Sequence, residues 1–100
     1  MQVIVTVKAM TDLVDIGQYI AQNNPAAADV LIDRLQRECK LLATVPLRYP
    51  LVEGYEQRGI RKRPVGNYLI FYRVGARVID VLHIVHHARD HAPLLSGDPS

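Results

Sequence analysis

Hydrophobic and polar residues change their spacing early in the chain. Residues 2–5, Gln-Val-Ile-Val, are rich in β-branched side chains, which is typical of a short strand. After Thr6, a suitable helix N-cap, apolar residues recur at spacings of three and four, as on one face of a helix of about four turns. The predicted apolar face carries Met10, Leu13, Ile16 or Gly17, and Ile20, with Asp12, Asp15 and Gln18 elsewhere on the helix.

A second helix follows with almost no linker. Asparagine tolerates the conformation that ends a helix, and Asn24 is placed to cap a new helix whose first residue is Pro25. So short a connection predicts that the two helices pack as an antiparallel hairpin. The apolar stripe of the second helix consists of Ala28, Leu31, Ile32, Leu35, Cys39 and Leu42.

The second half of the chain is predicted to form a sheet. Pro46 and Pro50 end the helical pattern and begin an irregular connection that runs to about Gln57. Three strands are then predicted as an antiparallel meander, over residues 59–64, 68–74 and 77–86, with turns at 65–67 and 75–76.

The order β-α-α-β-β-β predicts a two-layer α+β fold, with the helical hairpin packed on a small antiparallel sheet that the first strand joins. One hundred residues suffice for one domain but not for two. We expect that domain to span residues 1–95 and to be followed by a flexible tail over 96–100, which contains Gly97 and Pro99.

Composition narrows the class of protein. Apolar residues make up 49% of the chain and charged residues 22%, which excludes chain-wide disorder and a disulfide scaffold. The single cysteine, Cys39, lies on an apolar helical stripe and is expected to be a small buried hydrophobe rather than a nucleophile. The sequence shows no secretory leader and no apolar run of membrane-spanning length, so we expect a cytoplasmic protein.

The net charge of +2 hides an uneven distribution. The first fifty residues hold five charges of each sign, whereas the segment from Gln57 to Ile79 has no acidic residue and six basic ones. Such a basic strip favours a surface that binds phosphates or an acidic partner segment, because arginine forms paired contacts with both groups. The alternative is a solvated edge whose charge prevents aggregation. The six residues are Arg58, Arg61, Lys62, Arg63, Arg73 and Arg77.

Strand alternation divides this strip, placing Arg61 and Arg63 on one face and Lys62 on the other. Among the nearby aromatic residues, Phe71 is expected in the core, and Tyr68 and Tyr72 share a face that is half exposed.

Histidines gather at the end of the last predicted strand. His83, His86 and His87, with Arg89, suit general acid-base chemistry on RNA, since histidine titrates near neutral pH. However, no aromatic residue follows Tyr72 to stack on a base, which favours a binding role for His86 and Arg89 and a hydrogen-bonded strand position for His83. A zinc site that includes His91 is a minor alternative, because a period-two strand separates the histidines.

Six short motifs follow one another over about residues 6–90. They are Ala9-x-x-Asp12-Leu13-x-x-Ile16-x-x-Tyr19-Ile20-Ala21, Asn24-Pro25-x-Ala27-Ala28, Pro46-x-Arg48-Tyr49-Pro50, Gly59-Ile60-Arg61, Tyr68-x-Ile70-Phe71-Tyr72-Arg73 and Leu82-His83-Ile84-x-His86-x-Ala88-Arg89-Asp90. No single motif is diagnostic, but their order and spacing together are specific. In this order and spacing the chain resembles the ParE branch of the RelE/ParE toxin superfamily.

The resemblance implies the bacterial toxin of a type II toxin-antitoxin pair, of the kind that stabilises plasmids. It implies that the toxin inhibits DNA gyrase by binding, with no cofactor or metal, and that a ParD-like antitoxin neutralises it with an extended and helical segment. This segment would cover the exposed sheet face and a helical groove. The expected contact residues for target or antitoxin are Arg58, Arg61, Lys62, Arg63, Arg73, His86 and Arg89.

Two alternatives stay open at the level of sequence. One is a ribosome-dependent mRNA endonuclease of the RelE type, with Arg61, Arg73 and His86 as catalytic residues. The other is an inactive relative that only binds its antitoxin.

Overall fold

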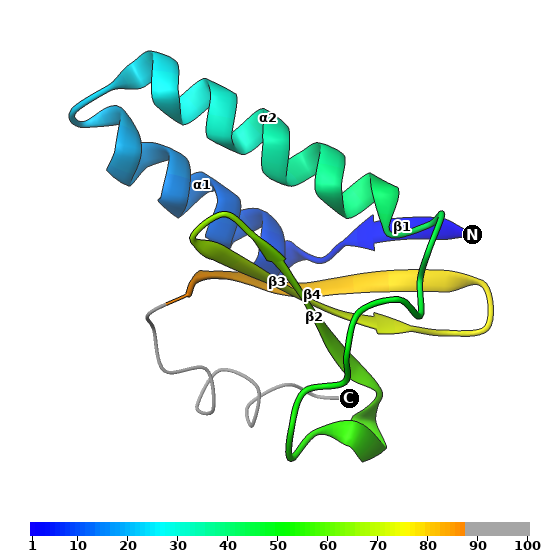
Figure 1. Cartoon of the computed structure of the whole chain (residues 1–100). Coiled ribbons are helices and arrows are strands. Elements are labelled where there is room, and N and C mark those ends of the chain that lie inside the picture. The colour runs from blue at the N-terminus through cyan, green and yellow to red at the C-terminus, as the bar shows by residue number, and fades with distance from the viewer. Residues whose placement is uncertain (88–100) are drawn as a thin grey trace.

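The helical hairpin lies on one side of a four-stranded sheet (Figure 1). The computed structural model describes residues 1–87. The predicted tail over 96–100, Arg89 and His91 lie outside the described residues. Within residues 1–87, no helix is long and apolar enough to cross a membrane.

Both predicted helix caps are confirmed. Strand β1, Gln2–Val5, ends at Thr6, whose hydroxyl accepts a hydrogen bond of 3.2 Å from the Ala9 amide and opens helix α1, Val7–Ala21. The Asn24 side chain accepts one of 3.0 Å from the Ala27 amide and opens helix α2, Pro25–Leu41. Each cap satisfies an amide at the helix start that has no partner within the helix.

The two helices pack closely where Gly17 of α1 faces Ile32 of α2. A Cβ atom placed on Gly17 would lie only 3.3 Å from Ile32 Cγ1, so the missing side chain lets the helices approach. The predicted apolar stripe of α2 is confirmed, with Ala28, Leu35 and Cys39 buried.

The sheet has the order β1-β4-β3-β2 and is mixed. Strands β2, Ile60–Val65, β3, Tyr68–Val74, and β4, Val78–His86, form the predicted antiparallel meander. Strand β1 pairs with β4 in parallel, so the expectation of an antiparallel sheet holds only for the other three strands. The parallel pairing follows from the helical hairpin, which carries the chain back across the sheet between β1 and the meander.

The boundaries of β2 lie one residue later than predicted. Gly59 does not belong to the strand, because it has a positive φ of 70° and ends a short 3-10 helix, Glu56–Arg58. Val65, which was predicted in the turn, instead pairs with Tyr68, and Gly66 takes the positive φ that the tighter turn requires.

Apolar side chains lie on both faces of the sheet. The main core fills the inner face, between the sheet and the helices, and includes Leu13, Leu35 and Tyr72. On the outer face, away from the helices, Val52 and Tyr55 of the connection after α2 pack on a smaller cluster that contains Phe71. Phe71 is a core residue as predicted, but part of the sheet face expected to be exposed is covered.

Two predictions of exposure were wrong. Tyr72 is fully buried rather than half exposed, because its hydroxyl reaches the connection and donates a hydrogen bond of 2.8 Å to the Pro46 carbonyl. On α1, Asp12 is buried and Met10 is 44% exposed, the reverse of the prediction for these two positions, whereas Leu13 is buried as predicted.

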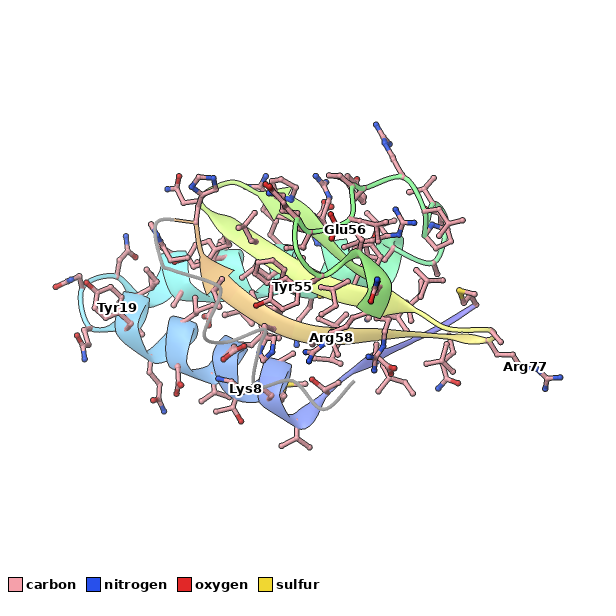
Figure 2. The ribbon with its side chains drawn as sticks, turned by 90° about the horizontal axis from the view of Figure 1, so that it is seen from below. Lys8, Tyr19, Tyr55, Glu56, Arg58 and Arg77 are labelled. Atoms are coloured by element: carbon pink, nitrogen blue, oxygen red, sulfur yellow. The ribbon has the colours of Figure 1, made fainter. Side chains whose placement is uncertain are left out.

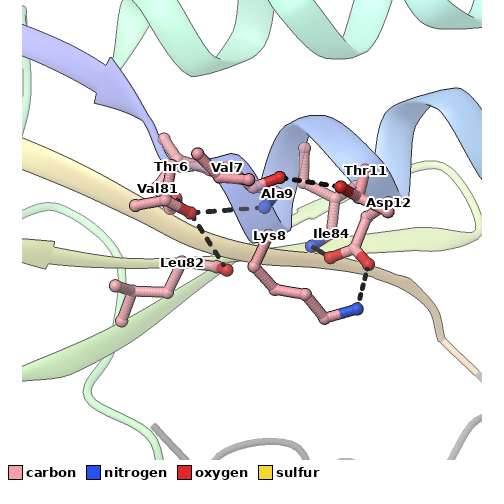
Figure 3. A network of polar contacts seen from close by, with 9 residues as sticks. All are labelled: Thr6, Val7, Lys8, Ala9, Thr11, Asp12, Val81, Leu82 and Ile84. Carbon is pink, nitrogen blue, oxygen red and sulfur yellow. Dashed lines mark hydrogen bonds and ion pairs between the residues drawn. The ribbon is translucent and has the colours of Figure 1, made fainter. Parts of the chain in front are cut away.

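Asp12 is buried because it completes the edge of β4 (Figure 3). Strand β1 pairs with β4 only as far as Val81, and α1 runs beside the remainder. There Asp12 Oδ2 accepts a hydrogen bond of 2.9 Å from the Ile84 amide, and Asp12 Oδ1 lies 2.7 Å from Lys8 Nζ. The carboxylate thus takes the place that another strand would fill.

Candidate functional site

The six basic residues of the strip occupy three separate places. Arg61 and Arg63 pair with Tyr72 and Ile70 of β3 and point to the inner face, toward the helices. Lys62 and Arg73 point to the outer face, and Arg77 projects from the β3–β4 turn at one end of the molecule (Figure 2). The predicted alternation of Arg61, Lys62 and Arg63 is confirmed.

Arg61 holds the connection between α2 and β2. Its Nη1 donates to the Tyr49 carbonyl at 2.7 Å and to the Leu47 carbonyl at 3.4 Å. The neighbouring Tyr72 hydroxyl binds the carbonyl of Pro46 in the same segment. Burial raises the pKa of Tyr72 above its usual value of 10.0, and the positive charge of Arg61 partly opposes that rise. This arginine therefore has a structural partner within the chain.

Arg63 belongs to a second internal cluster. Its Nη2 lies 2.7 Å from Glu38 Oε2 of α2, and its guanidinium stands 4.7 Å from the centre of the Tyr49 ring. Arg48 approaches the same ring, at 5.7 Å. Both members of the Arg63–Glu38 pair are about one-quarter exposed, so the ion pair is partly shielded from water.

Glu38 and Tyr49 were not predicted as partners of the basic strip. Glu38 follows Arg37 on an amphipathic helix and looks like an ordinary surface residue, and no local spacing connects it with Arg63, 25 positions away. The only signal in the sequence was the proximity of Tyr49 to two prolines, which marks an ordered connection.

The remaining cations lie on or near the outer face. Arg73 stands opposite Asp80 of β4 in the strand register, so one acidic side chain faces it across the sheet. The Arg58 guanidinium carbon lies 5.9 Å from the centre of the Tyr55 ring, and both side chains lie over the outer face of the sheet (Figure 2). The structure thus brings Arg58, Lys62 and Arg73 to one face, with Arg77 beyond its end.

His86 lies at the other end of the sheet. It packs edge-on against Tyr68, with ring centres 5.4 Å apart, beside a groove of about 540 Å³ between α1 and the end of β4. Tyr19, Asp15 and Ile16 of α1 line the opposite wall of this groove. Figure 2 shows Tyr19 and Arg77 at opposite ends of the molecule.

The three candidate ribonuclease residues do not converge. Arg61 lies on the inner face, whereas Arg73 lies on the outer face. His86 pairs with Tyr68, five positions along β3 from Arg73, which corresponds to about 17 Å. General acid-base catalysis needs its groups within hydrogen-bonding reach of one substrate, so this set cannot act together on one phosphate.

The structure also places the remaining histidines of residues 1–87 and the single cysteine. His83 is buried in β4, as expected for a strand residue, and His87 is exposed just beyond the strand. Within residues 1–87, no three His, Cys, Asp or Glu side chains gather closely enough to hold a metal ion. Cys39 is buried as predicted, and desolvation, reinforced by the charge of Glu38, raises the pKa of its thiol from 9.0 to about 12.

Comparison with known proteins decides the family. Residues 3–91 match the family model described as the ParE toxin of the type II toxin-antitoxin system parDE. The chain belongs to the ParE toxin family. The expectation drawn from the motifs is therefore confirmed at the level of family, and with it the role of toxin in a type II toxin-antitoxin system.

The fold of this ParE-family chain also matches a solved structure titled "Chromosomal ParDE TA system from P. aeruginosa". The match has a TM-score of 0.72 and 24% sequence identity, and it covers 86% of this chain and 95% of the other. No curated protein matches the chain. At this identity the structural match establishes the common fold.

Proposed function

We propose that this ParE-family toxin inhibits DNA gyrase by binding to it, and that a ParD-like antitoxin neutralises it. Membership of the family supports the antitoxin as a partner. The separation of Arg61, Arg73 and His86 is the observation that favours binding over RNA cleavage, since no shared site for a phosphate unites them.

The proposed target surface is the outer face of the sheet together with the β3–β4 turn. Lys62 and Arg73 are partly exposed there and Arg77 is exposed, whereas Arg61 and Arg63 are engaged with Tyr49 and Glu38. Cations of this kind attract the phosphates or acidic residues of a partner and direct its approach.

The proposed antitoxin contact is the groove between α1 and β4. Tyr19 is 70% exposed beside it, and Tyr68 and His86 line its end. A groove that combines apolar side chains with a few polar groups suits an extended or helical segment of a protein partner.

A gyrase assay tests the proposal. The purified chain should block the supercoiling of relaxed plasmid by gyrase or trap cleaved DNA, and the co-encoded antitoxin added in excess should restore the reaction. Cuts at codon positions in ribosome-bound mRNA, with gyrase unaffected, would contradict it. Normal growth when the chain is expressed without antitoxin would instead indicate an inactive relative.

A further inference from the structure

The two edges of the sheet differ in how they are protected. The edge of β2 is covered by the connection after α2, since the Val52 amide donates to the Ile60 carbonyl at 2.8 Å and the Lys62 amide to the Pro50 carbonyl at 3.1 Å. The edge of β1 has no such cover in the part of the chain that the structure describes, because β1 pairs with β4 alone. An uncovered edge is a template for pairing with another strand.

The main-chain groups that face outward follow from the pairing with β4. The amides of Gln2 and Thr6 donate to the carbonyls of Arg77 and Val81, at 3.3 and 3.1 Å. Because alternate residues of a strand direct these groups to opposite sides, the amides and carbonyls of Val3 and Val5 point away from the sheet. Each chain therefore offers two donors and two acceptors along this edge.

The side chains of this edge lack the usual protection against strand pairing. β1 carries no charged residue, no proline and no bulge. Ile4 points to the outer face and is 41% exposed, and Met1 and Val7 on either side of it are 52% and 86% exposed. An apolar, uncharged edge of this kind favours association.

We propose that β1 pairs with β1 of a second copy of this chain, antiparallel and centred on Ile4. In this register Val3 of one copy lies opposite Val5 of the other, so the four outward amides of the two strands meet the four outward carbonyls. Ile4 then lies opposite its own counterpart, and the exposed Met1 of one copy approaches Val7 of the other. All outward main-chain groups of both strands are satisfied in this one arrangement.

The pairing joins the two sheets into one of eight strands. Side chains opposite each other in an antiparallel pair point to the same face, so both helical hairpins lie on one side and both outer faces on the other. The contact involves only four residues of each strand and a few apolar side chains, so we expect a weak dimer that forms at high concentration. The inference does not depend on the identity of the target.

Sedimentation of the purified chain tests self-association. The apparent mass should rise from 11.2 kDa toward twice that value as the concentration increases. Ile4→Lys places two like charges opposite each other and should weaken the dimer by at least about tenfold. Val30→Lys is the matched control, because Val30 is an exposed valine on α2, away from this edge, and it should leave the dimer unchanged.

Cysteine cross-linking tests the register and does not depend on a charged variant. Residues opposite each other at a non-hydrogen-bonded position of an antiparallel pair have Cα atoms about 4.5 Å apart, within the range of a disulfide. Ile4→Cys should therefore form a covalent dimer under mild oxidation. Gln2→Cys, on the same face and strand, should not, because its counterpart lies about 13 Å away. The native Cys39 is buried and does not interfere.

Three results would overturn the proposal. These are a chain that stays monomeric at high concentration, equal cross-linking of the two cysteine variants, and equal effects of Ile4→Lys and Val30→Lys. If the unaltered chain is monomeric on its own and Ile4→Lys abolishes antitoxin binding, the edge of β1 would be assigned to the antitoxin instead.

Discussion

Asp12 shows how one side chain can replace a strand. Its carboxylate closes the edge of β4 where β1 has ended, and it binds the Ile84 amide from 72 positions away. A buried amide without an acceptor is costly, so the acidic group on α1 fixes the helix against the sheet. The Lys8–Asp12 ion pair neutralises the charge that this arrangement buries.

Asp12→Ala should lower the free energy of unfolding by about 2–3 kcal/mol, because the Ile84 amide loses a charged acceptor in a buried position. Asp12→Asn keeps a carbonyl oxygen that can accept this hydrogen bond, so it should lower the free energy of unfolding by less. Urea denaturation at neutral pH measures both. Asp15→Ala, an exposed position on the same helix, is the control and should change stability by no more than about 0.5 kcal/mol. Equal losses for Asp12→Ala and Asp15→Ala would show that the contact with β4 contributes nothing.

The buried thiol of Cys39 should make the free energy of unfolding depend on pH in the alkaline range. Burial raises the pKa of its thiol from 9.0 to about 12, so the folded state holds the proton more tightly than the unfolded state. The resulting stability is complete below pH 9 and falls as the pH rises from 9 to 12, by roughly 4 kcal/mol in total. Urea unfolding between pH 8 and 11 should show this fall, and Cys39→Ala should flatten it. A slope that Cys39→Ala leaves unchanged would assign it to other groups, such as Tyr72, whose pKa burial also raises.

The connection between α2 and β2 is the element that depends most on distant residues. Three side-chain hydrogen bonds, from Arg61 and Tyr72, hold the carbonyls of Pro46, Leu47 and Tyr49. The segment then continues along the edge of β2 and covers part of the outer face with Val52 and Tyr55. An irregular segment is therefore ordered by the sheet that follows it.

Arg61→Ala should release this connection. We expect a loss of about 1–3 kcal/mol in the free energy of unfolding, because carbonyls of Tyr49 and Leu47 lose a charged donor. Amide hydrogen exchange over residues 46–52 should become faster. Lys62→Ala is the matched control, since Lys62 is the next residue of the same strand and points to the opposite face. If exchange over 46–52 is the same in both variants, Arg61 does not hold the segment.

Local signals explain why the helices and strands could be predicted and the site could not. The caps at Thr6 and Asn24 and the alternation of side chains in β2 depend on neighbouring residues, and the structure confirms them. The roles of Asp12, Arg61 and Arg63 depend on partners 72, 12 and 25 positions away, which no periodicity reveals. A run of like charges predicted a surface, but two of its members are bound internally.

At the scale of the whole molecule, the division of the cations leaves one basic face. The helical side of the sheet uses Arg61 and Arg63 for packing, while Lys62 and Arg73 remain on the outer side and Arg77 at its end. These five residues of the strip thus contribute to stability on one face and to the proposed target surface on the other. Substitutions at the two sets should separate these effects.

Charge reversal on the outer face tests this division. The triple variant Lys62→Glu, Arg73→Glu and Arg77→Glu should weaken inhibition of gyrase by at least about tenfold, because it removes the positive field that attracts the target. The effect should shrink as salt is raised, since salt screens exposed charges. The control, Arg37→Glu with Lys40→Glu, reverses two exposed charges on α2 and should leave inhibition nearly unchanged. Circular dichroism should show that both variants are folded. Equal inhibition by the triple variant and the unaltered chain would place the target surface elsewhere, with the groove beside His86 as the next region to test.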